Sequence, residues 1–263
     1  MRGRTIAHIG ESLVETNLKQ KKRVYFLKAP VDLVDEETCF SLIEKMLGGD
    51  KNHQISFLNL RGMFRARRNM LYYRSLYESS LILPSSKGII RGLRFLHGLH
   101  AHRYNPFDFI ISLLSFAEKN GLSVYLFGAR KSDLEKAESN VRTSFPGLKI
   151  IGRHAGYADP EVERDIITAI KKSSPAFLLI GRGLREREIW IHRHREELQR
   201  GVSVWVDDCF EIFAGRFHYV DEKVFNAGLE SLTGLLQHPW RAFRIFQYLF
   251  FNILLVVYKL FKL

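Results

Sequence analysis

The sequence predicts an α/β fold: a Rossmann-like parallel sheet flanked by helices, with a C-terminal membrane-associating helical appendage. Two short apolar runs, at residues 124–128 and 176–181, end in glycine and precede helical patterns, as buried parallel strands do. Strand and helix patterns alternate from residue 122 to residue 206, which predicts right-handed crossovers. The third observation is an apolar stretch near the end of the chain, flanked by basic residues.

The first half of the chain has shorter and less regular patterns. Residues 1–30 are polar and basic. Asp32 or Asp35 is expected to cap a helix that carries Cys39 on its apolar face and ends at Gly48. The other elements expected here are strands at residues 23–27, 54–58 and 80–83, and helices at residues 59–77, 88–96 and 106–120.

The second half has clearer boundaries. Ser132 is expected to cap a helix, because Glu135 three residues later completes a capping box. Another helix is expected to begin after Asp159, with Pro160 in its first turn. The elements expected here are strands at residues 122–127, 148–152, 176–181 and 202–206, and helices at residues 132–144, 160–172 and 186–199.

The tail is apolar from Ile245 to Tyr258 and has basic residues on both sides. Its fourteen residues would form a helix of roughly 21 Å, shorter than the roughly 30 Å hydrocarbon core of a bilayer. We therefore expect Ile245–Leu263 to lie in one leaflet or at the interface, with its basic residues at the headgroups. The alternative is a helix buried in a homo-oligomer. The expected parts of the chain are an N-terminal extension (1–30), an α/β domain (31–216) and the appendage (217–263).

The charge of the chain favours anionic partners. Lys and Arg number 40 against 28 Asp and Glu, a net charge of +12, which suits nucleic acid, phosphorylated ligands or acidic lipids. No motif of a known nucleic-acid reader is present, so nucleic acid is not expected as a partner. Two distant cysteines indicate a reducing compartment, and residues 1–8 lack the pattern of a signal peptide. No metal and no cofactor are expected, because the histidines have no converging spacing.

Several short blocks follow one another in a specific order along the chain. Most end in or contain glycine. The blocks are Val124-Tyr-Leu-Phe-Gly128, Phe145-Pro-Gly-Leu-Lys-Ile-Ile-Gly152, Gly156-Tyr157, Ile180-Gly-Arg-Gly183, Glu188-Ile-Trp-Ile191, Phe213-Ala-Gly215 and Gly228-Leu-Glu230, with Pro239 and Arg241. Together they resemble the WecG/TagA/CpsF family of bacterial glycosyltransferases (glycosyltransferase family 26), of which the chain looks like a divergent member. The resemblance extends from about residue 54 to about residue 244.

This resemblance implies a membrane-associated enzyme of bacterial polysaccharide synthesis, including exopolysaccharide. Members of the family transfer a sugar, often of the N-acetylmannosamine type, from a UDP-sugar to a polyprenyl-diphosphate-linked acceptor. The implied partners are a nucleotide sugar, a lipid-linked acceptor, the membrane through Ile245–Leu263, and other polysaccharide synthase subunits or a second copy of the chain. The implied location is the cytoplasmic face of the bacterial inner membrane, as a peripheral or monotopic protein.

The chain departs from the family pattern at functional positions. Phe57 replaces a threonine shortly before the retained Asn59. Ser85 replaces the family's candidate general base, an aspartate, and a serine hydroxyl has no basic form near neutral pH. The chain is therefore either an enzyme with a relocated base or a catalytically inactive homologue. The inactive homologue would act as a nucleotide-sensing or scaffolding subunit of a polysaccharide synthase complex.

Asp108 and Glu188 are the expected catalytic residues, because both carboxylates match family positions. The structural alternatives are a helix cap for Asp108 and a salt bridge for Glu188. Nucleotide binding is expected at strand ends, where glycine lets the backbone approach phosphate and helix N-termini offer N–H groups. The expected nucleotide-binding residues are Asn59, Gly128, Gly181, Gly183, Arg185, Arg187 and Glu211.

Arginines are dense between residues 61 and 103 and again between residues 182 and 187. Arginine binds phosphate bidentately, so both groups could border an anionic ligand. A cyclic dinucleotide is one such ligand, since Arg61 with Arg65, and Arg130 with Asp133, form short patterns often used for it. The favoured alternative is a basic face near anionic lipid.

Overall fold

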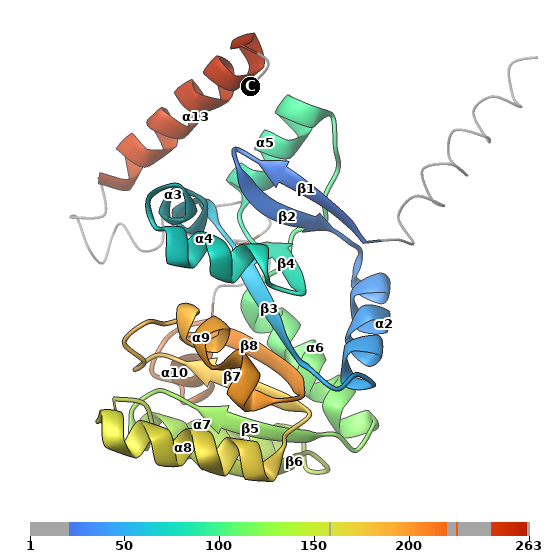
Figure 1. The fold of residues 1–263 in the computed structure, drawn as a ribbon, viewed down its shortest axis with the longest axis vertical. Helices are drawn as coiled ribbons and strands as arrows, with labels where there is room; N and C mark the ends of the chain where they lie inside the picture. Colours follow the sequence, from blue (N-terminus) through green and yellow to red (C-terminus); the bar gives the residue numbers. More distant parts are fainter. Residues whose placement is uncertain (1–20, 158, 220–224, 226–242, 262–263) are drawn as a thin grey trace, which may run out of the picture.

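The structure of the protein is a computed structural model that describes residues 21–157, 159–219, 225 and 243–261. Its centre is a six-stranded sheet in the order β4–β3–β8–β7–β5–β6, in which every pair is parallel (Figure 1). The expected α/β class with a parallel sheet is confirmed. The strands are β3 (Asn52–Leu58), β4 (Leu81–Pro84), β5 (Ser123–Phe127), β6 (Lys149–His154), β7 (Phe177–Gly181) and β8 (Gly201–Asp207).

Helices cover both faces of this sheet. On one face α2 (Glu36–Leu47), α6 (Pro106–Lys119), α7 (Lys131–Ser144) and α10 (Cys209–Phe213) share a core with the sheet. On the other face α8 (Pro160–Ser173) and α9 (Ile189–Leu198) pack on β5 and β7. A third core joins α3 (Leu60–Arg68), α4 (Met70–Tyr77) and α5 (Lys87–His97) to an antiparallel hairpin of β1 (Lys22–Phe26) and β2 (Ala29–Leu33).

The order of the strands creates a switch point between β5 and β7. The crossover through α7 leads from β5 outward to β6, whereas the crossover through α9 leads from β7 back to β8. The two helices pack in different cores, on opposite faces of the sheet. Their N-termini therefore diverge at the carboxyl ends of β5 and β7, which is where ligands bind in open α/β sheets.

Local sequence explains the boundaries that differ from the expected ones. Asp35 is the N-cap of α2, and its carboxylate accepts a hydrogen bond from the Thr38 N–H. The helix expected at residues 59–77 is divided at Asn69, because the Asn69 side chain accepts from Tyr72 N–H and starts α4. The expected Ser132 cap is wrong: α7 begins at Lys131, after Arg130. The strand β2 and the short helix α10 were not expected.

The last described helix, α13 (Phe243–Phe261), packs on α5 at the end of the molecule that also holds the hairpin (Figure 1). Phe251 and Leu255 face the body and are buried, whereas Leu249, Ile253 and Leu260 are exposed. No helix among the described residues has the length and apolarity needed to cross a membrane. The family positions at residues 228–230, 239 and 241 lie outside the described residues, and the three expected parts of the chain stay predictions.

Candidate functional site

The loops that follow the central strands are joined by backbone hydrogen bonds. Ala129 N–H donates to the Arg182 carbonyl oxygen (2.6 Å), and Gly156 N–H donates to the Ala129 carbonyl oxygen (2.9 Å). Arg182 N–H in turn donates to the Asp207 carbonyl oxygen (3.1 Å). The loops after β5, β6, β7 and β8 thus form one connected rim, here called the carboxyl edge.

Two of the expected nucleotide-binding glycines make this rim possible. Gly128 has φ +124°, and a Cβ placed on it would lie 2.7 Å from the backbone carbon of Gly181. Gly183 has φ +104°, and its Cβ would lie 3.0 Å from the Gly156 Cα. Glycine is required at both positions, because it adopts a positive φ without strain and has no Cβ to clash with the neighbouring backbone. The described geometry therefore assigns these glycines a role in bringing the loops together.

Several residues with side chains are strained at the same edge. Ala129 (φ 55°), Tyr157 (φ 60°), Arg187 (φ 52°) and Asp207 (φ 46°) all have left-handed backbone conformations. Each such residue costs about 1–3 kcal/mol, and such residues cluster at functional sites. The carboxyl edge around the switch point is thus the strongest structural candidate for a ligand site.

Charged side chains lie beside the switch point. Arg182 donates from Nε to the Asp207 carboxylate (3.0 Å) and from Nη2 to the Asp208 carboxylate (3.3 Å). Glu211, on α10, is 3% exposed, and its Oε2 has no hydrogen-bond partner among the described residues. Burial raises the pKa of Glu211, and burial together with the Asp207 carboxylate raises the pKa of Asp208. The edge therefore holds carboxyl groups that take up protons more readily than exposed ones.

Glu211→Gln is expected to increase the free energy of unfolding at pH 7. The pKa of Glu211 is above its ordinary value of 4.5, so the folded state binds this proton more tightly than the unfolded state. The ionised Glu211 carboxylate destabilises the unaltered protein fully at pH values above its pKa in the folded state. The effect is absent below its pKa in the unfolded state, because the group is then protonated in both states. The greater stability of Glu211→Gln should therefore disappear as the pH falls. Urea unfolding at several pH values measures it, with exposed Glu44→Gln as the control. A pH-independent difference would contradict the argument.

Ser85 directly follows β4, whose carboxyl end is on the same side of the parallel sheet as the carboxyl edge. Its N–H donates to the Leu58 carbonyl oxygen (2.9 Å), and its carbonyl oxygen accepts from Arg103 Nε (3.1 Å). The next residue, Tyr104, donates its N–H to the Pro84 carbonyl oxygen (2.9 Å). These contacts hold the segment before α6 against the end of β4, beside the position of the family's aspartate.

Asp108 is the third residue of α6 and is partly buried. It does not cap the helix, because Asn105 does so. Its Oδ1 accepts a hydrogen bond from the Tyr219 hydroxyl (2.8 Å). Phe107 contacts both Phe213 of α10 and the Tyr219 ring, with ring centroids 4.8 Å and 5.2 Å away. Asp108 therefore lies near the C-terminal end of α10, the helix that follows β8.

Phe57 and Asn59 have structural contacts at the end of β3. The Phe57 ring meets the Phe109 ring edge-on, with centroids 5.4 Å apart. The exposed Asn59 is the N-cap of α3, and its Oδ1 accepts from Gly62 N–H (2.8 Å). The replaced threonine position is thus filled by an aromatic contact, and the retained asparagine starts a helix.

Glu188 lies between α9 and α3. Its Oε1 accepts from Arg65 Nη1 (3.0 Å), and the Arg65 guanidinium lies 4.4 Å from the Tyr72 ring centroid. Its carbonyl oxygen accepts from Gln54 Nε2 (3.3 Å). The salt bridge considered as the structural alternative is present, and the catalytic role of Glu188 stays a prediction.

The remaining charged residues of interest are distributed around the rim. Arg185 and Arg187 are exposed in the loop between β7 and α9. Asp133 accepts a hydrogen bond from Arg216 Nη1 (2.6 Å), and Arg65 forms an ion pair with Glu188. Each of the two short patterns considered for a cyclic dinucleotide therefore has one residue that already binds another residue of the protein.

The sequence did not indicate Tyr219 as a partner of Asp108, because 111 residues separate them.

Comparison with known proteins identifies the family. The model of the glycosyl transferase WecG/TagA/CpsF family matches residues 24–263. The chain is 27% identical over 189 residues to the N-acetylglucosaminyldiphosphoundecaprenol N-acetyl-beta-D-mannosaminyltransferase of Bacillus subtilis (strain 168), covering 71% of this chain and 72% of that one. It is 27% identical over 216 residues to the protein of the same description from Bacillus spizizenii, covering 80% and 83%. The resemblance expected from the short blocks is confirmed: the chain belongs to the glycosyl transferase WecG/TagA/CpsF family.

Proposed function

We propose that the protein is a membrane-associated glycosyltransferase that moves a sugar from a nucleotide sugar, such as a UDP-sugar, to a lipid-linked acceptor in bacterial polysaccharide synthesis. The observation that carries this proposal is the family match over a sheet with a strained switch point between β5 and β7. The two relatives are described as transferases acting on an undecaprenyl-diphosphate-linked sugar. This description supports the same class of acceptor here.

The nucleotide sugar would bind over the loops of Gly128 and Gly181–Gly183. Arg185 and Arg187 are exposed in the next loop and would bind the diphosphate, because guanidinium groups pair with phosphate bidentately. Glu188 would hold this loop through its ion pair with Arg65. Glu211 would supply a further polar group at the sugar side of the site.

Asp108 would act as the general base in place of the aspartate that Ser85 replaces. Its carboxylate would take the proton from the acceptor hydroxyl while that oxygen attacks the anomeric carbon of the donor. The bond from the anomeric carbon to the diphosphate would break, and the nucleoside diphosphate would leave with the bonding electrons. Asp108 is partly exposed and oriented by the Tyr219 hydroxyl, which suits a group that must meet the acceptor.

The helix α13 would attach the protein to the membrane as a peripheral protein of the cytoplasmic face. Its outer side is apolar, with Leu249 55%, Ile253 62% and Leu260 73% exposed. A helix with one side packed on the protein and an apolar outer side suits the interfacial region of a bilayer.

A catalytically inactive subunit is the second candidate function. Ser85 is 8% exposed and cannot act as a base, and Phe57 packs against Phe109 in place of a hydroxyl. Such a subunit would bind a nucleotide, or hold other polysaccharide synthase subunits or a second copy of the chain, without transferring sugar.

Ser85→Asp separates the two functions. If Asp108 has taken over as base, the unaltered protein transfers radiolabelled sugar from UDP-sugars to a polyprenyl-diphosphate-linked N-acetylglucosamine. Ser85→Asp should then change kcat by less than about tenfold, because general-base catalysis is already supplied. Calorimetry on the same preparation measures nucleotide binding, and Ser85→Asn is the uncharged control. Nucleotide binding without turnover across a broad donor panel, with turnover only in Ser85→Asp, would overturn the enzyme proposal.

A further inference from the structure

A cavity of about 600 Å³ lies between the β1–β2 turn, the end of α5 and the last turns of α13. Three of its lining residues are basic: Lys28, His97 and Lys259. Leu27 and Leu96 supply apolar walls, and the lining contains no carboxylate. Such a cavity suits a ligand that is both anionic and partly apolar.

The hairpin turn holds Lys28 at this cavity in a strained conformation. Phe26 pairs with Ala29, so Leu27 and Lys28 form a two-residue turn, and both are left-handed (φ 48° and 72°). Such turns ordinarily use Asn-Gly or similar pairs, because left-handed backbone is costly for other residues. The turn is fixed by the buried Leu27 side chain and by a hydrogen bond from Arg67 Nη1 to the Leu27 carbonyl oxygen (3.2 Å). Strained residues of this kind cluster at ligand sites, which is consistent with a use for the charge of Lys28 at the cavity.

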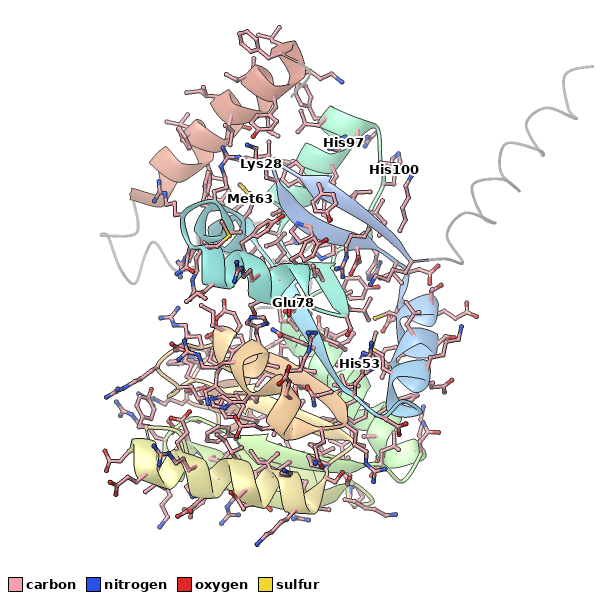
Figure 2. The ribbon with its side chains drawn as sticks, in the orientation of Figure 1. Lys28, His53, Met63, Glu78, His97 and His100 are labelled. Atoms are coloured by element: carbon pink, nitrogen blue, oxygen red, sulfur yellow. The ribbon has the colours of Figure 1, made fainter. Side chains whose placement is uncertain are left out.

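The opposite wall belongs to α13 and is tied to the body by two contacts. Lys259 Nζ donates to the Phe95 carbonyl oxygen (3.1 Å), and the Tyr258 hydroxyl accepts from Arg67 Nη1 (3.1 Å). Figure 2 shows Lys28 at the tip of the hairpin and His97 at the end of α5. The cavity is therefore formed where three segments distant in sequence meet.

The surface around the cavity is apolar and exposed. Phe95 is 47% exposed, Leu260 73% and Phe261 70%. Cations beside exposed aliphatic and aromatic side chains match the layering of a membrane interface, where anionic headgroups lie above acyl chains. The elements that line the cavity, β1, α5 and α13, lie at the opposite end of the molecule from β5, β6 and α8 (Figure 1), so the cavity is separate from the switch point.

We propose that this cavity binds the anionic headgroup of a membrane glycerophospholipid. Lys28 and Lys259 contact the phosphate from the two walls, while the apolar side of α13 lies among the acyl chains. The inference rests on the proposed attachment of α13 to the membrane and adds to it a specific lipid site. Anionic lipid thereby fixes the hairpin and α13 together at the bilayer surface.

The test uses the full-length protein with vesicles of phosphatidylcholine, with and without phosphatidylglycerol. Lys28→Gln/Lys259→Gln is expected to lower partitioning onto the anionic vesicles by more than roughly 25-fold, because diffuse attraction alone accounts for about one factor of five per lysine and the headgroup contacts add to it. Arg91→Gln/Arg94→Gln is the matched control, since both arginines are exposed on α5 and neither lines the cavity. An equal or larger loss in this control would mean diffuse attraction and overturn the inference.

A second measurement separates a lipid site from a phosphate site. Calorimetry with monomeric dihexanoyl-phosphatidylglycerol should show binding to the unaltered protein and to the Arg91→Gln/Arg94→Gln control, and none to Lys28→Gln/Lys259→Gln. Inorganic phosphate should not compete. Retained lipid binding in the lysine variant, or equal binding of inorganic phosphate, overturns the inference.

A third variant tests the proposed attachment of α13 to the membrane separately from the headgroup site. Leu249→Glu/Ile253→Glu places charges on the exposed side of α13, away from the cavity. It should abolish binding to both kinds of vesicle and leave binding of the monomeric lipid intact. Vesicle binding at the level of the unaltered protein would overturn the attachment while leaving the headgroup site standing.

Discussion

Asp108→Asn is expected to lower kcat for sugar transfer about a thousandfold, within the range typical of a lost general base. Asparagine has nearly the same shape as aspartate, but its amide cannot accept a proton near neutral pH. The Tyr219 hydroxyl can still donate to the amide oxygen as it donates to Oδ1 of Asp108 (2.8 Å). The substitution therefore removes the base while the start of α6 keeps its contacts. Single-turnover transfer from a radiolabelled UDP-sugar measures the effect.

Two further measurements distinguish the loss of a catalytic base from a loss of nucleotide binding or of local structure. Nucleotide affinity by calorimetry should be unchanged in Asp108→Asn, because the proposed diphosphate ligands are Arg185 and Arg187. Tyr219→Phe should lower kcat by less than about tenfold, since it removes one neutral hydrogen bond and leaves the carboxylate. Transfer at the original rate in Asp108→Asn would exclude this residue as the base, and the same assay on Glu211→Gln would then test a second carboxyl of the site.

The strands of the sheet were predictable because a buried parallel strand leaves a simple pattern. The runs that form β5 and β7 are continuous and apolar; Gly128 follows β5, and Gly181 is the last residue of β7. Burial on both faces requires such a run whatever the neighbouring strands are. The strand β2 gave no such pattern, because it holds Pro30 and the charged Asp32. Its burial depends on partners elsewhere in the chain.

The candidate site was predictable in its position more than in its contacts. Gly128, Gly181, Gly183 and Glu211 gather at one edge because the carboxyl ends of parallel strands lie side by side. The partners of the site residues did not follow from spacing. Arg65 and Glu188 are 123 residues apart, and a pair at that distance leaves no periodic pattern. Only the fold brings such residues together.

Asp32 is a buried carboxylate with several partners that are distant in sequence. It is fully buried in β2, and it accepts from Arg23 Nε and Nη2 at 2.8 Å each. Its Oδ2 also accepts from the Ile82 N–H of β4 (2.8 Å), and Lys21 Nζ lies 3.5 Å away. One carboxylate therefore joins the hairpin to the edge strand of the sheet.

Asp32→Ala is expected to lower the free energy of unfolding by about 3–5 kcal/mol, because it leaves the half-buried Arg23 guanidinium without its counter-ion and the buried Ile82 N–H without its acceptor. Denaturant unfolding measures the loss. Asp35→Ala, three residues along the chain, is the matched control and should cost only about 1 kcal/mol, the usual value for an N-cap. In Arg23→Met/Asp32→Leu both charges are removed together, so much of the stability should return. If Asp32→Ala costs no more than the control, or the double variant is less stable than Asp32→Ala, the carboxylate is not what holds the hairpin to β4.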